Sequence, residues 1–322
     1  MSNNVSIEYA NGIVKTLEKN LLTREKIVRL TDADSVETAV KILLECNYGR
    51  DGFTGDIDKL LFEEENKVTD IFKELMPSGY ALETFVYASD YHNAKACYKS
   101  KIVGKPNPSA LRPSGLFDVQ SAFETENYRT LPTRMCEAIA YLDELNQKGQ
   151  ITGATIDNVF DKAYYKNVFD DLAKAKKSVV NEYFVLQVDS LNIKNFARCK
   201  KIGLDFSEYR KCFIDGGKTD LKKLETIYSL SLAECKEKMK FGDYAEDFSV
   251  LSGDYSAYET FADNRLIKLF KNQKSDMFSP SPVLGYYLGK LCELKVVRTV
   301  LTCKANKLDR NEIRKRIRET YA

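Results

Sequence analysis

Histidine and tryptophan are almost absent, since the 322 residues include a single histidine, His92, and no tryptophan. One imidazole cannot supply a zinc site with three histidines, an H-E-x-x-H helix or an iron site with two histidine ligands. A serine or cysteine catalytic triad would have to form around His92 itself. The sequence therefore predicts a protein that binds no metal or cofactor and is not an enzyme.

A charge excess of either sign is also missing, because 49 Lys and Arg residues face 47 Asp and Glu residues and leave a net charge of +2. A protein that binds nucleic acid by neutralising phosphates usually carries a clear basic excess. We therefore expect no nucleic-acid partner.

Long apolar runs and paired cysteines are missing too. No segment approaches the roughly 18 consecutive apolar residues of a membrane-spanning helix, and the first residues are polar. The eight cysteines contain no C-x-x-C pair, and most lie among apolar neighbours, as buried thiols do in a reducing compartment. These features predict a soluble cytoplasmic protein.

Glycine and proline are scarce, at 16 and 7 residues, which favours helices over strands and tight turns. Apolar residues recur at helical spacing over 35–46, after the capping box Asp34-Ser-Val-Glu37. Helices are also expected over 59–76 and 80–101, and the strongest breaks at 105–114, 215–218 and 279–282. We predict an all-α fold.

The most informative feature is an internal repeat. The segment 85–95, FVYASDYHNAK, matches 184–194, FVLQVDSLNIK, at an offset of 99 residues. A weaker third copy, 287–295, follows about 101 residues later. Copies of about 100 residues fill the chain and predict three similar helical domains with pseudo-threefold symmetry, over 1–112, 113–214 and 215–322.

The repeated helix carries two polar stripes. Asp90 and Asn93 share one stripe, and Lys95 and Lys99 share another. A structural interpretation is that the Asp and Asn side chains satisfy backbone groups of loops or helix ends, while the lysines form a solvated face. A functional interpretation is that three such helices line a polar concavity that grips a partner. The sequence leaves both open.

Two other segments invite a functional interpretation. Gly216-Gly217-Lys218-Thr219 resembles the end of a phosphate-binding loop, but the full pattern requires glycine at the position of Cys212, so nucleotide binding is not expected. The run 304–321 is basic and amphipathic. We favour a closing helix with a charged outer face over a cationic surface for lipid headgroups or an acidic partner.

Several motifs occur in the order and spacing of one known family. They are the doubled Asp-x-x-Asn-x-Lys at 90–95 and 189–194, the Gly216-Gly217 turn, Ala262-Asp263-Asn264, Pro280-x-Pro282-Val-Leu-Gly-Tyr286, Glu293-x-Lys295 with Arg298, and the ending 313–321. Over essentially its whole length the chain resembles the C subunit of bacterial and archaeal V-type (A-type) ATPases, which is the counterpart of the eukaryotic d subunit. The third copy departs from the pattern, because Lys290 replaces the Asp and Glu293 replaces the Asn.

The resemblance implies a funnel of three helical domains, one copy per complex, that caps the membrane rotor ring on its cytoplasmic side. Its socket would hold the end of the central axle and transmit torque between ATP turnover and ion translocation, without any chemistry of its own. The candidates for the socket are the polar positions of the repeat helices: Asp90, Asn93, Lys95, Lys99, Asp189, Asn192, Lys194, Arg198, Glu293, Lys295 and Arg298. The alternative is a cytosolic helical adaptor that binds another protein in the same concavity.

Overall fold

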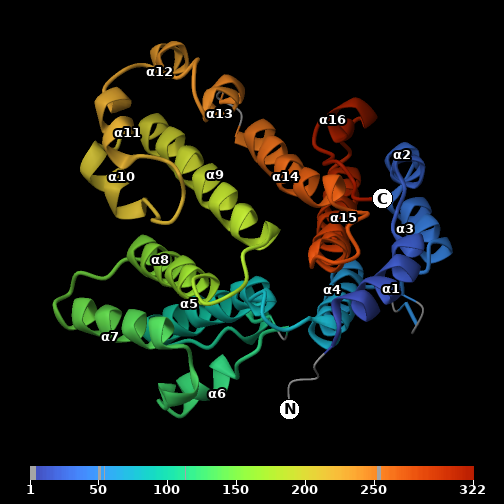
Figure 1. Ribbon diagram of the computed structural model, residues 1–322, viewed down its shortest axis with the longest axis horizontal. Helices are drawn as coiled ribbons and strands as arrows, with labels where there is room; N and C mark the ends of the chain where they lie inside the picture. The colour runs from blue at the N-terminus through green and yellow to red at the C-terminus, as the bar shows by residue number, and fades with distance from the viewer. Residues whose placement is uncertain (1–4, 50–51, 54, 113, 252–254) are drawn as a thin grey trace. The chain divides into compact units, whose positions relative to one another are not determined.

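The computed structural model describes residues 5–49, 52–53, 55–112, 114–251 and 255–322. All regular secondary structure within these ranges is helical, which confirms the predicted all-α class (Figure 1). None of the described helices contains a stretch long and apolar enough to cross a lipid bilayer. The chain divides into two compact units, of which unit 1 comprises 1–78 and 252–322 and unit 2 comprises 79–251.

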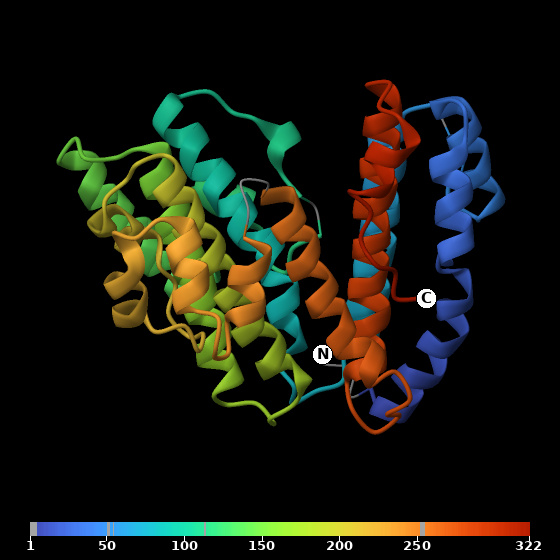
Figure 2. The same ribbon diagram turned by 90° about the horizontal axis from the view of Figure 1, so that it is seen from above.

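Unit 1 is built around one long helix, α15 (Ser281–Ala305), which carries buried residues along most of its length. A helix with buried residues on most of its sides is stable only when neighbouring helices cover those sides. In Figure 2, α15 is drawn in red beside the blue helices of the same unit. It packs against α1 (Ile7–Leu17), α2 (Arg24–Asp32), α3 (Val36–Glu45), α4 (Ile57–Leu75), α14 (Tyr255–Asn272) and α16 (Arg310–Arg314). The unit also contains the short 3-10 helix η1 (Glu18–Asn20).

The core of unit 1 lies between α2, α3, α4 and α15. Leu30, Leu43, Leu61 and Val297 come from these four helices, and each is at most 2% exposed. Burying a side chain of this size contributes about 1.5–3 kcal/mol relative to leaving it in water. Both ends of the chain therefore contribute to a single core.

Unit 2 is organised around α8 (Gly153–Leu172), which packs against both α7 (Thr133–Gln147) and α5 (Tyr87–Val103) (Figure 1). Helix α9 (Val179–Lys201) contacts α8, α10 and α13. The remaining helices of the unit are short: η2 (Leu82–Phe85), η3 (Pro108–Ala110), α6 (Val119–Glu124), η4 (Tyr128–Thr130), α10 (Phe206–Cys212), α11 (Leu221–Tyr228), α12 (Leu232–Lys238) and α13 (Ala245–Val250).

Two predicted helix starts differ from the structure. The hydroxyl of Ser35 caps α3 and accepts a hydrogen bond from the Thr38 N–H at 3.1 Å, so the predicted cap at Asp34 is wrong by one residue. The second shift concerns α5, which begins later than expected, at Tyr87. Ala81 has a left-handed φ of 52°, which a right-handed helix cannot contain, and η2 lies between the two residues.

The two compact units do not follow the boundaries of the three predicted domains. Repeat helices α5 and α9 lie in unit 2, and α15 lies in unit 1. The compact units differ from the repeats because a repeat helix packs on a helix from another copy of the repeat. Helix α5 packs on α8, and α15 packs on α4. The symmetric division into 1–112, 113–214 and 215–322 stays a prediction, and Pro113 at its first boundary lies outside the described residues.

The basic C-terminal run closes unit 1. Arg310 and Arg314 form ion pairs with Asp34 and Asp32, at 2.6 and 2.7 Å. The Lys304 ammonium donates hydrogen bonds to backbone carbonyl groups at the C-terminal end of α2. The predicted single closing helix is wrong, because only the end of α15 and the short α16 are helical in this run, but its cations do bind the unit that it closes.

Tyr321 fixes the end of the chain against α15. A Cβ atom at Gly285 would lie 2.4 Å from the Tyr321 hydroxyl oxygen, and one at Gly289 would lie 2.5 Å from the Tyr321 Cβ. The hydroxyl donates a hydrogen bond to Glu18 at 3.3 Å, and the Lys274 ammonium lies 4.7 Å from the ring centroid. Two glycines in α15 thus make room for one aromatic ring.

We expect Gly289→Ala to lower the free energy of unfolding by about 1–3 kcal/mol, because the added methyl group must displace the Tyr321 ring. The control is Gly12→Ala in α1, where a Cβ atom would meet nothing within 4 Å. That change should raise the free energy by about 0.5–1 kcal/mol, because alanine favours a helix. Urea unfolding of the two full-length variants measures the difference, and equal effects would contradict the packing role of Gly289.

Candidate functional site

The first half of α5 holds the connection that follows this helix. Asp90 is fully buried, and its carboxylate accepts hydrogen bonds from the backbone N–H groups of Leu116 and Phe117, at 2.9 and 3.1 Å. Gly115 makes room for the carboxylate, since a Cβ atom there would lie 2.1 Å from Asp90 Oδ1. Backbone donors stabilise a carboxylate that would be very unfavourable in the core without partners.

Helix α9 repeats this arrangement one copy later. Asp189 accepts hydrogen bonds from the backbone N–H and the hydroxyl of Thr219, at 2.8 and 2.6 Å. A Cβ atom at Gly217 would lie 2.2 Å from Asp189 Oδ1, and one at Gly216 would lie 2.1 Å from the Phe169 ring. Close packing against α8 and α9 explains both glycines of the segment that resembles a phosphate-binding loop.

Asn93 and Asn192 hold the same connections at a second point. Each side-chain amide bonds to both the N–H and the carbonyl group of one residue. Asn93 bonds to Arg112 at 2.7 Å in both directions. Asn192 bonds to Ile214 at 2.9 Å for the N–H and 2.8 Å for the carbonyl. These are the contacts that the structural interpretation predicts for the Asp and Asn positions.

In the third copy, Lys290 and Glu293 occupy the two positions. The Glu293 carboxylate accepts hydrogen bonds from the Leu22 N–H and the Tyr48 hydroxyl, and it forms an ion pair with Lys290 at 2.6 Å. The Lys290 ammonium also lies 3.9 Å from a Glu64 oxygen and 4.0 Å from the centroid of the Tyr48 ring. Leu22 lies between η1 and α2, so α15 holds an N-terminal segment, whereas α5 and α9 hold segments that follow them.

The cluster in α15 places one ammonium and two carboxylates inside unit 1. Burial, together with the nearby Glu293 carboxylate, raises the pKa of Tyr48 well above its ordinary value. The phenol therefore stays protonated and donates its hydrogen bond across the ordinary pH range. Lys290 and Glu293 stand out in the sequence as departures from the repeat, whereas no sequence signal connects Tyr48 to them.

The second stripe of each repeat helix carries the basic positions, which we define as Lys95 and Lys99 in α5, Lys194 and Arg198 in α9, and Lys295 and Arg298 in α15. In α5, both lysines form ion pairs with α8, Lys95 with Asp161 and Lys99 with Asp157. Ion pairs that are this exposed each contribute no more than about 1 kcal/mol.

The basic positions of the other two copies differ in their surroundings. In α15, Lys295 pairs with Asp263 at 3.0 Å, and Arg298 pairs with Asp58 of α4. In α9, Lys194 is half-buried and Arg198 is exposed. Cations therefore recur at corresponding positions along all three repeat helices.

The structure separates the predicted site residues into two groups. The anchor residues are buried and bonded within the chain: Asp90, Asn93, Asp189, Asn192 and Glu293. The basic positions are half-buried or exposed. The basic positions are therefore accessible from the surface, whereas the anchor residues are not. A role of either group in binding a partner stays a prediction.

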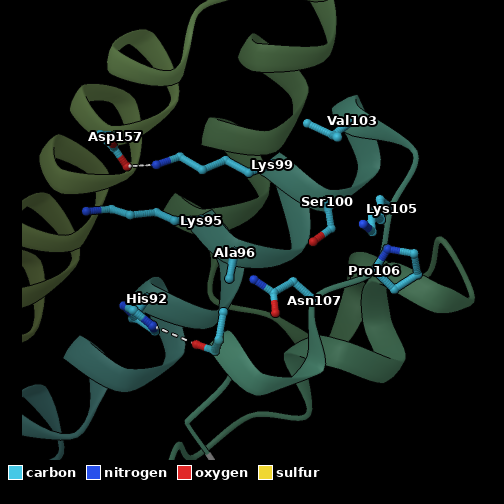
Figure 3. Close-up of a pocket in the computed structure, with 11 residues that line it drawn as sticks. His92, Lys95, Ala96, Lys99, Ser100, Val103, Lys105, Pro106, Asn107 and Asp157 are labelled. Atoms are coloured by element: carbon cyan, nitrogen blue, oxygen red, sulfur yellow. Dashed lines mark hydrogen bonds and ion pairs between the residues drawn. The ribbon is translucent and has the colours of Figure 1, made fainter.

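A pocket of about 750 Å³ lies beside the basic positions of α5 (Figure 3). Lys95, Lys99 and Lys105 line it, with Asp157 as its carboxylate. The His92 ring lies at its edge, with Nε2 2.9 Å from the carbonyl oxygen of Ala110 at the end of η3. This balance of charge suits an acidic side chain of a partner. Among the described residues, no cluster of three or more His, Cys, Asp or Glu side chains is arranged to hold a metal ion.

We expect Asn192→Ala to lower the free energy of unfolding of the chain by about 2 kcal/mol or more, because the buried N–H and carbonyl groups of Ile214 lose their partners. The control is Asn195→Ala, at a half-buried position of the same helix, and it should stay within about 0.5 kcal/mol of the wild type. Denaturant unfolding followed by circular dichroism measures both. Similar losses for the two variants would rule out a specific anchoring role.

Burial lowers the pKa of His92 below its ordinary value of about 6.5. Because the unfolded chain then binds a proton more readily than the folded chain, this residue favours folding above pH 6.5, and its contribution is lost as the pH falls through the folded pKa. An NMR titration of the single imidazole checks the shift against the same chain in urea. An equal or higher folded pKa would contradict the burial of the ring.

Comparison with known sequences agrees with the motifs. The family described as ATP synthase (C/AC39) subunit matches residues 10–316. The C subunit of the A-type ATP synthase of Thermococcus kodakarensis is 23% identical over 313 residues, which cover 91% of this chain and 85% of that protein. The C subunit of the V-type sodium ATPase of Enterococcus hirae is 20% identical over 324 residues, which cover 97% and 98%. The chain therefore belongs to the ATP synthase (C/AC39) subunit family, whose members are structural rather than catalytic subunits.

Proposed function

We propose that this chain is the central-stalk rotor subunit that couples the axle of a V-type ATPase to the membrane rotor ring. In this role it transmits torque between ATP turnover and ion translocation. The observation that carries the proposal is the recurrence of cations on three repeat helices of a chain that belongs to this subunit family. The protein lies at the cytoplasmic face of the membrane, held there by the ring, with one copy in each complex.

The axle is proposed to bind at the basic positions. A coiled-coil end has no threefold symmetry, so three similar helices cannot all offer it the same rigid apolar surface. Long cationic side chains adapt to different neighbours and still provide attraction to carboxylates. The exposed ion pairs of Lys99 and Lys295 are weak enough for their lysines to exchange one carboxylate for another.

The anchor residues support the proposed coupling in a different way. Torque passes through a protein only if its helices and connections keep their relative positions under load. Asp90 and Asp189 each tie a connection to a repeat helix, and Glu293 ties the N-terminal segment to α15. We propose that these hydrogen bonds act as local crosslinks, which give the protein the stiffness that the coupling requires.

Reversing the charges at Lys194 and Arg198 tests the axle site. We expect the double variant Lys194→Glu, Arg198→Glu to weaken binding of the axle protein at least about tenfold, because like charges across an interface cost several kcal/mol. The matched control is Lys222→Glu, Lys223→Glu, which reverses two lysines in α11. Calorimetric titration of the purified axle protein into each full-length variant gives the affinities.

Circular dichroism shows whether each variant remains folded. Unchanged axle affinity of the folded Lys194→Glu, Arg198→Glu variant would remove these two residues from the binding site. Purification of the tagged wild-type chain from its own cells tests the wider proposal. Recovery of the chain without axle or ring subunits would contradict the rotor role and favour the cytosolic adaptor.

A further inference from the structure

Two of the eight cysteines lie side by side in unit 2. Cys199 is in the last turn of α9, and Cys212 is the last residue of α10, a helix that packs against α9. Both thiols also face the phenol groups of Tyr209 and Tyr228, where burial raises the pKa and the two thiols add to the rise. The fold therefore brings together two sulfur atoms that lie 13 residues apart in the sequence.

The two thiols contact each other. Burial and then the Cys212 thiol, which hydrogen-bonds with that of Cys199, raise the pKa of Cys199 to about 11. Both cysteines are free thiols. A disulfide bond needs sulfur atoms about 2.05 Å apart and a defined torsion, so neighbouring thiols form one with the smallest change of the backbone. The pair is therefore positioned for a covalent bond.

The two cysteines differ in their access to solvent. Cys199 is 6% exposed, whereas Cys212 is half-buried. Two hydrogen bonds orient the Cys212 side chain, because its sulfur accepts one from the Asn158 amide at 3.5 Å and donates one to the Glu208 carbonyl at 3.6 Å. Reagents attack accessible thiols first. A reagent in solution therefore reaches Cys212 before Cys199.

Basic residues flank both cysteines in the sequence. Arg198 precedes Cys199, and Lys211 precedes Cys212, and both cations are exposed. The carboxylate that faces Cys199 belongs to Glu208, and it forms an ion pair with Lys211. Surface cations raise the local concentration of anionic reagents. The surroundings of the pair therefore favour an anionic oxidant.

We propose that Cys199 and Cys212 are a reversible oxidation site, at which an anionic small-molecule disulfide of the glutathione class converts the two thiols into one internal disulfide bond. The bond lies within the chain and needs no partner protein, so it does not depend on the proposed rotor function. It fastens the end of α10 to the end of α9 and closes the connection between them into a covalent ring.

The oxidation consists of two thiol–disulfide exchange steps. The Cys212 thiolate attacks one sulfur of the small disulfide, which forms a mixed disulfide and releases one small thiolate. The Cys199 thiolate then attacks the Cys212 sulfur, which forms the internal bond and releases the second small thiolate. The protons of the two protein thiols end on the two released thiols. The protein thus loses two electrons and two protons, and the small disulfide gains them.

The test treats the full-length protein with oxidised glutathione at neutral pH. Trypsin digestion without a reductant separates the two cysteines, because the segment between them contains Lys200, Lys201, Arg210 and Lys211. We expect mass spectrometry to find the Cys199 and Cys212 peptides joined, with a mass lower by two hydrogen atoms than their sum. Dithiothreitol should separate them again.

Single variants establish the order of the two steps. In Cys199→Ala, the reaction should stop at a mixed disulfide of Cys212 with one glutathione. In Cys212→Ala, we expect Cys199 to react at least about tenfold more slowly than Cys212 does in the wild type, because burial keeps the reagent away. The matched controls are Cys97→Ala and Cys136→Ala, which replace two other half-buried cysteines and should form the internal bond as the wild type does.

A stability measurement shows whether the bond suits the native fold. A disulfide that fits the native positions stabilises a protein by restricting its unfolded chain. Oxidation should therefore raise the urea midpoint of the wild type, and dithiothreitol should reverse the rise. The same treatment should not raise the midpoint of Cys199→Ala. Circular dichroism shows that each variant is folded before treatment.

Three results would overturn the proposal. A mixed disulfide of Cys212 as the final product in the folded wild type would show that Cys199 is out of reach. Joined peptides from other cysteines in equal amounts would show that the bond is not specific to this pair. A lower urea midpoint of the oxidised wild type would show that the native fold does not accommodate the bond. Each of these results leaves the proposed rotor function intact.

Discussion

The structure depends on one constraint, which is that backbone groups buried beside the repeat helices need partners. A buried N–H or carbonyl group without a partner costs about 1–3 kcal/mol. Asp90 and Asn93 meet this requirement for the connection after α5, and Asp189 and Asn192 meet it for the connection after α9. The polar residues that mark the repeat in the sequence are therefore the residues that hold each copy together.

The third copy shows what happens when that constraint changes. The backbone group that Glu293 binds belongs to Leu22, in the N-terminal part of the chain. The hydrogen-bond acceptor moves from the first position of the motif to Glu293, and Lys290 balances its charge. The third repeat helix is therefore held differently from the first two.

The sequence was sufficient for the helical class, the repeat helices and the main breaks, because helical periodicity and glycine or proline signals are local. It was also sufficient to place Asp90 and Asn93 on one stripe of their helix. Their partners could not be predicted, because Leu116 and Arg112 reach them only through the conformation of an irregular connection. The packing of α15 against α4 could not be predicted either, because a repeat identifies equivalent helices but not the helices that pack beside them. The shifted start of α5 depends on one left-handed residue, Ala81.

Unit 1 draws its core from both ends of the chain, which has a consequence for the order of folding. During synthesis, residues 1–78 leave the ribosome long before α15, whereas unit 2 is continuous in sequence and complete by residue 251. At about 5–20 residues per second, the N-terminal helices wait roughly 10–40 s for the helix that covers their apolar faces. Unit 2 can fold in that interval, so α15 completes the core of unit 1 only after unit 2 has been made.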